Sequence, residues 1–266
     1  MKKNKTIGLA LGSGGFRGFA HIGAIRSLEK NGIPISYLSG CSIGAWVAAY
    51  YSLFLDINKL EEDMTANPRE NMLLLFDLSW NGGFVGGSKF AGFLEKNLQH
   101  KKFSDTKIPL KIITTDLISG MPYIFESGDV AQAVRASTSL PILFKPMEYK
   151  NKLLVDGGLI NPVPGDLVRK MGADIVIGVN LYNKNEFIKQ NFPITKVIIR
   201  SARIGLHSLA KMAMRDVDVA VEPDVSKYNE ESSVSQYFTK DIANEIIRIG
   251  EKAMDKAIPQ IKELLK

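Results

Sequence analysis

The strongest constraint on the fold of this chain is a pattern that occurs twice within its first 55 residues. A short apolar segment leads through a glycine-rich turn into a helical stripe of apolar residues. Residues 6–11 and 35–38 are the two apolar segments, and the helical stripes begin at Phe19 and Ala45. Because strand-like and helix-like periods alternate in this way, the chain is predicted to have an α/β fold.

The rest of the chain continues the same alternation. We expect mostly helix over residues 56–100, with a glycine-rich break at 81–87. The further strands are predicted at 110–117, 122–125, 152–155, 175–181 and 218–221, and the further helices at 130–136, 194–214 and 243–265. No repeat, linker or low-complexity segment interrupts the pattern, so residues 1–266 are predicted to form a single domain.

Charge and cysteine content narrow the classes of partner and compartment. The formal net charge is +6, but no aromatic-rich basic motif accompanies it, so we expect no nucleic-acid partner. The single cysteine, Cys41, excludes an intramolecular disulfide and a cysteine-based metal site. The apolar run at residues 7–11 is too short for a signal peptide, and no stretch approaches the roughly 20 apolar residues of a membrane span. We therefore expect a cytoplasmic protein, and this location is compatible with peripheral contact with a membrane.

The sharpest local motif is Gly-Cys-Ser-Ile-Gly, which lies in a predicted tight turn at residues 39–44, between a strand and a helix. In that context a G-x-S-x-G motif holds its serine in a strained turn and exposes the hydroxyl at the end of the strand. Ser42 is thus a candidate nucleophile, and Gly40 and Gly44 leave room around it. The five letters alone also fit an ordinary glycine-rich turn.

A second glycine-rich loop, Ser13-Gly-Gly-Phe-Arg-Gly, also lies between a strand and a helix. Such a loop exposes backbone N–H groups that can hold a phosphate or the oxyanion of acyl transfer. Ser13 occupies the first glycine position of a dinucleotide-binding motif, and no acidic residue ends the second strand. The GK[ST] ending of a P-loop is missing as well. The oxyanion interpretation is therefore favoured over the nucleotide one, which stays open.

The serine needs a base. The three histidines, His21, His100 and His207, lie in positions where packing or a solvated helix end explains them. By contrast, Asp156 ends a predicted strand and precedes two glycines that allow a sharp turn. A carboxylate beside a serine hydroxyl can take its proton as general base. Asp156 is therefore the candidate base, although an ordinary Asp-Gly turn fits the same letters.

The three motifs SGGFRG, GCSIG and DGG occur in the order of the motif set of the patatin-like phospholipases, and the chain resembles that family. The similarity is dense over residues 9–51 and 135–181 and weaker to the end of the chain. The resemblance implies a three-layer α/β/α fold with a central, mostly parallel sheet. It also implies hydrolysis of fatty acyl esters of phospholipids, lysophospholipids or related lipids, without metal or cofactor.

Carried over by position, Ser42 would be the nucleophile and Asp156 the base of a catalytic dyad. The oxyanion and substrate-binding positions implied by the resemblance are Gly14, Gly15, Arg17, Gly18 and Ile43. Arg17 is expected either to order the loop or to face a lipid phosphate. Ser13 stands where the family usually has glycine, which the loop tolerates unless that position needs a positive φ.

Three segments are candidates for contact with the acyl chain. Residues 71–80 could line its pocket or touch a bilayer at the mouth of the site, although an ordinary core helix fits them better. Residues 81–87 could hinge a lid, and Phe144 could form a wall. Two other classes of protein remain open at this point. One is a carboxylesterase or thioesterase that acts on soluble substrates, and the other is a protein whose glycine loop binds phosphate or nucleotide.

Overall fold

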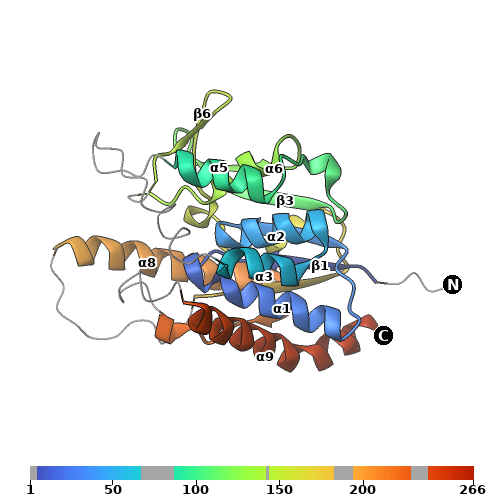
Figure 1. Cartoon of the computed structure of the whole chain (residues 1–266). Coiled ribbons are helices and arrows are strands. Elements are labelled where there is room, and N and C mark those ends of the chain that lie inside the picture. The colour runs from blue at the N-terminus through green and yellow to red at the C-terminus, as the bar shows by residue number, and fades with distance from the viewer. Residues whose placement is uncertain (1–4, 67–86, 142–143, 183–193, 229–238) are drawn as a thin grey trace.

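The computed structural model describes residues 5–66, 87–141, 144–182, 194–228 and 239–266 (Figure 1). Within them a single eight-stranded sheet has the strand order β5-β6-β3-β2-β1-β7-β8, in which β6 and β2 pair with one edge of β3 and β4 pairs with its other edge. The strands are β1 (Ile7–Leu11), β2 (Tyr37–Cys41), β3 (Leu110–Asp116), β4 (Pro122–Phe125), β5 (Met147–Tyr149), β6 (Lys152–Asp156), β7 (Ile175–Val179) and β8 (Val219–Val221).

Most of the sheet is parallel. The strands β1, β2, β3, β7 and β8 run in one direction, while β6 and β4 are antiparallel to β3. The carboxyl ends of the five parallel strands therefore meet at one edge of the sheet, which is where ligands bind in open α/β folds.

Helices cover both faces of this sheet, as Figure 1 shows. They are α1 (Phe19–Lys30), α2 (Ile43–Phe54), α3 (Ile57–Thr65), α5 (Ser88–Asn97), α6 (Val130–Ser137), α7 (Gly165–Lys170), α8 (Ile194–Ala213) and α9 (Lys240–Leu265). Alternate residues of β1 separate the two layers: Leu9 and Leu11 join the core under α1, α2 and α9, whereas Ala10 packs with Val168 of α7. The expected three-layer α/β/α fold with a mostly parallel sheet is confirmed.

The second strand differs from its predicted bounds. It covers Tyr37–Cys41 instead of residues 35–38, so the expected six-residue turn shrinks to Ser42 alone. The reason is pairing on both sides: Ser39 and Gly40 bond into register with β1 and β3, which keeps small and polar residues extended inside the sheet. The short strand β5 and the short helix α7 were not predicted from sequence.

Candidate active site

Ser42 lies alone between β2 and α2, in a backbone conformation with φ 54° and ψ −124°. A positive φ is uncommon and strained for a residue with a side chain, and it persists only where the surroundings impose it. One such contact is the backbone N–H of Ser42, which donates a hydrogen bond of 2.8 Å to Ser137 Oγ. That hydroxyl in turn donates to the carbonyl of Ile113 in β3, at 2.7 Å. Ser42 is therefore held at an elbow with the geometry expected of a nucleophile motif.

The second glycine of the motif allows a close approach between α2 and β1. A Cβ added at Gly44 would lie 2.2 Å from the carbonyl oxygen of Leu11, so no larger residue fits without a shift. The same contact brings the first turn of α2 against the end of β1, where the glycine-rich loop begins. Because a helix N-terminus carries partial positive charge, α2 favours negative charge that develops beside Ser42.

Asp156 ends β6, which pairs with the same edge of β3 as β2 does, directly beyond the end of β2. It pairs with Thr114 of β3, while Cys41, which precedes Ser42, pairs with the adjacent Ile113. The carboxylate is buried and accepts a hydrogen bond of 2.8 Å from the N–H of Gly158. The thiol of Cys41 approaches the same Oδ1 at 3.8 Å. The fold thus brings the elbow and Asp156 to one edge of the sheet.

Cys41 is the link between these two segments. Burial, followed by the charge of the neighbouring Asp156, raises the pKa of the Cys41 thiol well above its ordinary value. The thiol therefore stays protonated and acts as a donor toward the carboxylate. The sequence does not reveal this contact, because it depends on the register between β2, β3 and β6.

The glycine-rich loop begins where β1 ends. The N–H of Gly12 bonds to the carbonyl of Val179, and that of Ser13 bonds to the carbonyl of Pro162. Gly14 caps a 3-10 helix over Gly15–Gly18, and the first N–H groups of such a turn have no partner within the helix. Gly14 and Gly15 therefore have the placement expected of oxyanion donors. Ser13 does not have a positive φ, which explains how serine replaces glycine there.

Arg17 is 1% exposed and faces the protein interior. Its Nε donates to the carbonyl of Gly14 at 3.1 Å, and its guanidinium lies 5.2 Å from the ring centroid of Tyr182. Tyr182 also bonds to the Ser13 hydroxyl, at 3.0 Å. Of the two roles expected for Arg17, the structure supports ordering of the loop, because a buried guanidinium cannot meet a phosphate at the surface.

Gly18 and Ile43 join the loop to the elbow. A Cβ added at Gly18 would lie 2.1 Å from Cγ1 of Ile43, so the glycine leaves space for that side chain. Ile43 is the first residue of α2, and its N–H is one of the unpaired donors of a helix N-terminus. Both residues thus lie at the predicted site, and the contact between them holds the two motifs together.

His21 supports the loop from within. It is fully buried in α1, and its Nε2 lies 2.7 Å from the carbonyl oxygen of Gly12, to which it must donate. Burial lowers the pKa of His21 to about 4, with the Gly12 hydrogen bond opposing the shift. His21 is therefore neutral at pH 7. Sequence reasoning placed it in the packing, but not on the carbonyl that precedes the loop.

The other two histidines lie elsewhere. His100 is exposed and follows α5 with a φ of 52°. His207 is half-buried on α8, inside the helix predicted over 194–214. Sequence reasoning missed Ser137 and Tyr182, whose contacts with the elbow and the loop come from distant segments.

The three acyl-chain candidates have different outcomes. Phe144 is buried and stacks on Phe90 of α5 at 5.8 Å between ring centroids, in a cluster that includes Trp46 of α2. Its role as an acyl-chain wall stays a prediction. Residues 71–80 and 81–86 lie outside the described residues.

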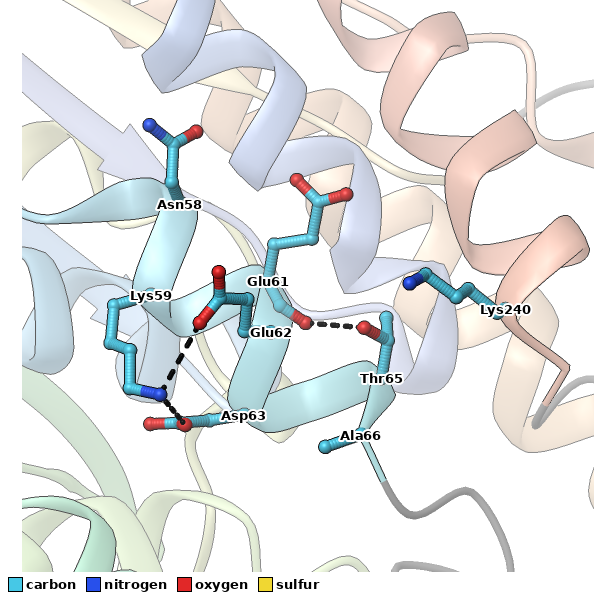
Figure 2. Close-up of a pocket in the computed structure, with 8 residues that line it drawn as sticks. All are labelled: Asn58, Lys59, Glu61, Glu62, Asp63, Thr65, Ala66 and Lys240. Atoms are coloured by element: carbon cyan, nitrogen blue, oxygen red, sulfur yellow. Dashed lines mark hydrogen bonds and ion pairs between the residues drawn. The ribbon is translucent and has the colours of Figure 1, made fainter.

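A hollow of about 480 Å³ lies elsewhere, between α3 and the start of α9 (Figure 2). It is lined by Asn58, Lys59, Glu61, Glu62, Asp63, Thr65, Ala66 and Lys240. Three of its charged groups pair with one another, since Lys59 lies 3.3 Å from Glu62 and 3.1 Å from Asp63. None of the lining residues belongs to the elbow, the loop or the aspartate segment.

Metal ligands and membrane spans were also sought in the described part of the chain. It contains no group of three histidine, cysteine, aspartate or glutamate side chains placed to hold a metal ion. Nor does any described helix combine the length and apolar character that crossing a bilayer requires.

The fold and the elbow define a class: three-layer α/β proteins that hold a serine at a strand-to-helix turn beside a glycine-rich loop. Within that class, the family model of the patatin-like phospholipases matches residues 9–168, a segment that contains the loop, Ser42 and Asp156. The chain belongs to the patatin-like phospholipase family.

Relatives and solved structures agree with this assignment. The chain is 32% identical over 187 residues to mouse patatin-like phospholipase domain-containing protein 6; the match covers 68% of this chain and 14% of that protein. It is 31% identical over 176 residues to an uncharacterized NTE family protein of Mycobacterium bovis, covering 66% of this chain and 49% of that one. The chain thus spans less than half the length of either relative.

Two solved structures share the fold at low sequence identity. VipD from Legionella pneumophila superposes with a TM-score of 0.57 at 13% identity, over 94% of this chain and 67% of that chain. Human GIVD cytosolic phospholipase A2 superposes with a TM-score of 0.51 at 12% identity, over 98% of this chain and 59% of that chain.

Proposed function

We propose that this protein is a serine lipid acyl hydrolase that cleaves fatty acyl esters of phospholipids or lysophospholipids, with Ser42 as nucleophile and Asp156 as base. The observation that carries the proposal is the strained Ser42 elbow, joined through Cys41 to the buried Asp156 carboxylate. Membership of the patatin-like phospholipase family supports lipid esters as the substrate class. The proposal treats residues 1–266 as one catalytic domain, which the single sheet supports.

In the first half-reaction the Asp156 carboxylate takes the proton of the Ser42 hydroxyl, and Oγ attacks the carbonyl carbon of the ester. The carbonyl oxygen becomes an oxyanion, which the N–H groups of Gly14, Gly15 and Ile43 stabilise. Donors of this kind that are fixed before the reaction are each worth roughly 10²–10³ in rate. The tetrahedral intermediate then expels the alcohol, which takes the proton back from Asp156.

In the second half-reaction Asp156 takes a proton from water, and the resulting hydroxide attacks the acyl-Ser42 ester. The oxyanion forms at the same N–H groups, and Ser42 leaves with the proton held by Asp156. The fatty acid is released and the enzyme returns to its starting state. A carboxylate beside the serine hydroxyl suits this role, because it can accept the proton as general base.

Arg17, Tyr182 and His21 act in this account by holding the loop. Arg17 binds the Gly14 carbonyl and His21 binds the Gly12 carbonyl, so the two contacts fix the backbone on either side of Ser13. A loop that is ordered before substrate arrives has no reorganisation cost during the reaction.

The test is fatty acid release from phosphatidylcholine and lysophosphatidylcholine, beside hydrolysis of a short-chain soluble ester. Wild type and His207→Ala are expected to release fatty acid, while Ser42→Ala and Asp156→Asn lose activity by about 10³-fold or more. Activity on the soluble ester alone would replace the lipid substrate with a carboxylesterase function. Inactivity on all esters, with thermal stabilisation by nucleotide, would contradict the proposal.

A further inference from the structure

Helix α8 presents its apolar residues outward and its arginines inward. Ile194, Ile198, Ile204 and Met212 are 73%, 54%, 51% and 58% exposed, whereas Arg200 and Arg203 are 8% and 5% exposed. Amphipathic helices of globular proteins normally bury the apolar stripe and expose the charges. The outward stripe of α8 therefore needs a partner that the described residues do not supply.

The exposed residues form one continuous face. Ile194, Ile198, Ser201, Gly205, Ser208 and Met212 recur every three or four residues, which is the spacing of one side of an α-helix. Val197 and Ile204 flank this stripe and are exposed as well. The opposite side, with Leu206 and Ala210, packs toward the sheet. A face that combines large apolar residues with glycine and small hydroxyl residues, and that has no carboxylate, is suited to an apolar surface.

The charge of α8 points to the kind of surface. Over Ile194–Ala213 the helix carries four basic residues and no acidic one; Arg200 and Arg203 are buried on its inner side and do not contribute to the outer face. Lys211 lies exposed at the border of the apolar stripe. Helices that lie in the plane of a membrane combine an apolar face with basic residues, because anionic headgroups attract the charge while the apolar side chains enter the boundary of the acyl chains.

Position ties this face to the candidate active site. A Cβ added at Gly158, two residues after Asp156, would lie 3.4 Å from Cδ2 of Leu206 on α8. Leu159, the residue that follows Gly158, is 36% exposed. The inner side of α8 therefore lies against the aspartate segment, while the outer side is exposed among the residues that the structure describes. Figure 1 shows the outer end of α8 extending beyond the sheet.

A second group of exposed apolar residues lies at the same edge of the sheet. The turn after β3 exposes Leu117, Ile118 and Met121. Because β3 is parallel to β2, this turn and Ser42 both follow the carboxyl ends of strands. Two separate exposed apolar groups thus belong to the edge at which the candidate catalytic residues meet.

We propose that the outward face of α8 docks on the surface of an anionic phospholipid bilayer and thereby brings the Ser42–Asp156 edge to its lipid substrate. The delivery of the site to its substrate rests on the proposed function, but docking itself requires no catalysis. Binding can therefore be measured with Ser42→Ala protein, so that a failure of docking and a failure of hydrolysis are separate results.

The first experiment is co-sedimentation of Ser42→Ala protein with vesicles of phosphatidylcholine containing phosphatidylglycerol. Ile198→Glu and Ile204→Glu are each expected to weaken partitioning by about tenfold or more, since each replaces an isoleucine that the docked protein would bury in the bilayer with a negative charge. Higher salt or vesicles of phosphatidylcholine alone should weaken binding of the unsubstituted face. The matched control is Leu55→Asp, an exposed apolar residue at the other end of α2, which should leave binding unchanged.

A second measurement, the fluorescence of an attached dye, detects docking without a substitution that weakens binding. Because Cys41 is buried, a cysteine introduced by Ile198→Cys can carry an environment-sensitive dye, with Leu55→Cys as its control. Vesicles should shift the emission of the dye at position 198 to the blue and leave that at 55 unchanged.

In the otherwise unsubstituted enzyme, Ile198→Glu should lower hydrolysis of vesicle lipid about as much as binding, and leave soluble-ester hydrolysis within twofold. Equal vesicle binding by Ile198→Glu, Ile204→Glu and Leu55→Asp would overturn the proposal. So would a dimer in sedimentation velocity that Ile198→Glu dissociates, without vesicle binding, because a second copy would then cover the face.

Discussion

The Ser137 hydroxyl accepts a hydrogen bond of 2.8 Å from the backbone N–H of Ser42, and so connects the end of α6 with the elbow. The same hydroxyl donates to the Ile113 carbonyl of β3 at 2.7 Å. Ser137 therefore fixes the strained residue to β3, the strand that pairs with both β2 and β6. The contact uses the backbone N–H of Ser42 and does not involve its hydroxyl.

Ser137→Ala should lower kcat for ester hydrolysis by about tenfold, which corresponds to about 1.4 kcal/mol of lost positioning, with a smaller change in KM. It should also lower the free energy of unfolding by about 1–3 kcal/mol, because a buried N–H and a carbonyl lose their partner. The control is Thr138→Ala, whose hydroxyl bonds to the Val134 carbonyl within its own helix. Steady-state kinetics and urea unfolding check both; equal kcat values for the two variants would contradict the role of Ser137.

Gly44→Ala should destabilise the protein by about 1–3 kcal/mol and reduce hydrolysis, because the added Cβ would lie 2.2 Å from the Leu11 carbonyl. Gly92→Ala in α5 is the matched control, since no atom lies within 4 Å of its Cβ position. That change should instead stabilise the helix by about 0.5–1 kcal/mol. Thermal unfolding of the two variants compares them directly, and a Gly44→Ala protein as stable as Gly92→Ala would refute the close approach.

His21 should make stability depend on pH. Because the folded pKa is about 4 and the ordinary value is 6.5, the unfolded chain binds more protons between these values. The free energy of unfolding should therefore be fully retained above pH 6.5 and fall toward pH 4, by on the order of 3 kcal/mol from this residue. His21→Gln keeps an amide donor for Gly12 and cannot titrate, so urea unfolding from pH 7 to 4 should show a shallower decline. An unchanged slope would show that His21 is not the group responsible.

Cys41 should be inert in the folded protein, because it is buried and its pKa is raised well above the ordinary value. A thiol reagent such as 5,5′-dithiobis(2-nitrobenzoic acid) at pH 8 should label the native protein only over hours, and the urea-unfolded protein at once. Rapid labelling of native protein would show that the β2 end is open to solvent.

Much of the fold could be predicted because apolar periodicity reports burial. The strand at Pro122–Phe125 and the long helix α8 were located from this signal alone. The end of β2 was not, because Ser39 and Gly40 have low strand propensity and stay extended only through pairing with β1 and β3. The orientation of α8 was equally hidden, since periodicity shows that a helix has an apolar side but not which side faces the sheet.

The candidate site also has a part that the sequence predicts and a part that only the folded chain reveals. Motif spacing made Ser42, Asp156 and the glycines of the loop candidates, because each lies in a turn whose letters are locally constrained. The contacts of Ser137, Cys41 and Tyr182 depend on segments that meet only in the folded sheet. A single sequence carries no local signal for such contacts.

The most direct test of the proposed dyad is covalent labelling by a fluorophosphonate probe, with the modified peptide located by mass spectrometry. Wild type and His207→Ala should be labelled at Ser42, Ser42→Ala should not be labelled, and Asp156→Asn should react far more slowly because the hydroxyl has lost its base. Labelling of Asp156→Asn at the wild-type rate, or its loss in His207→Ala, would contradict the Ser42–Asp156 account.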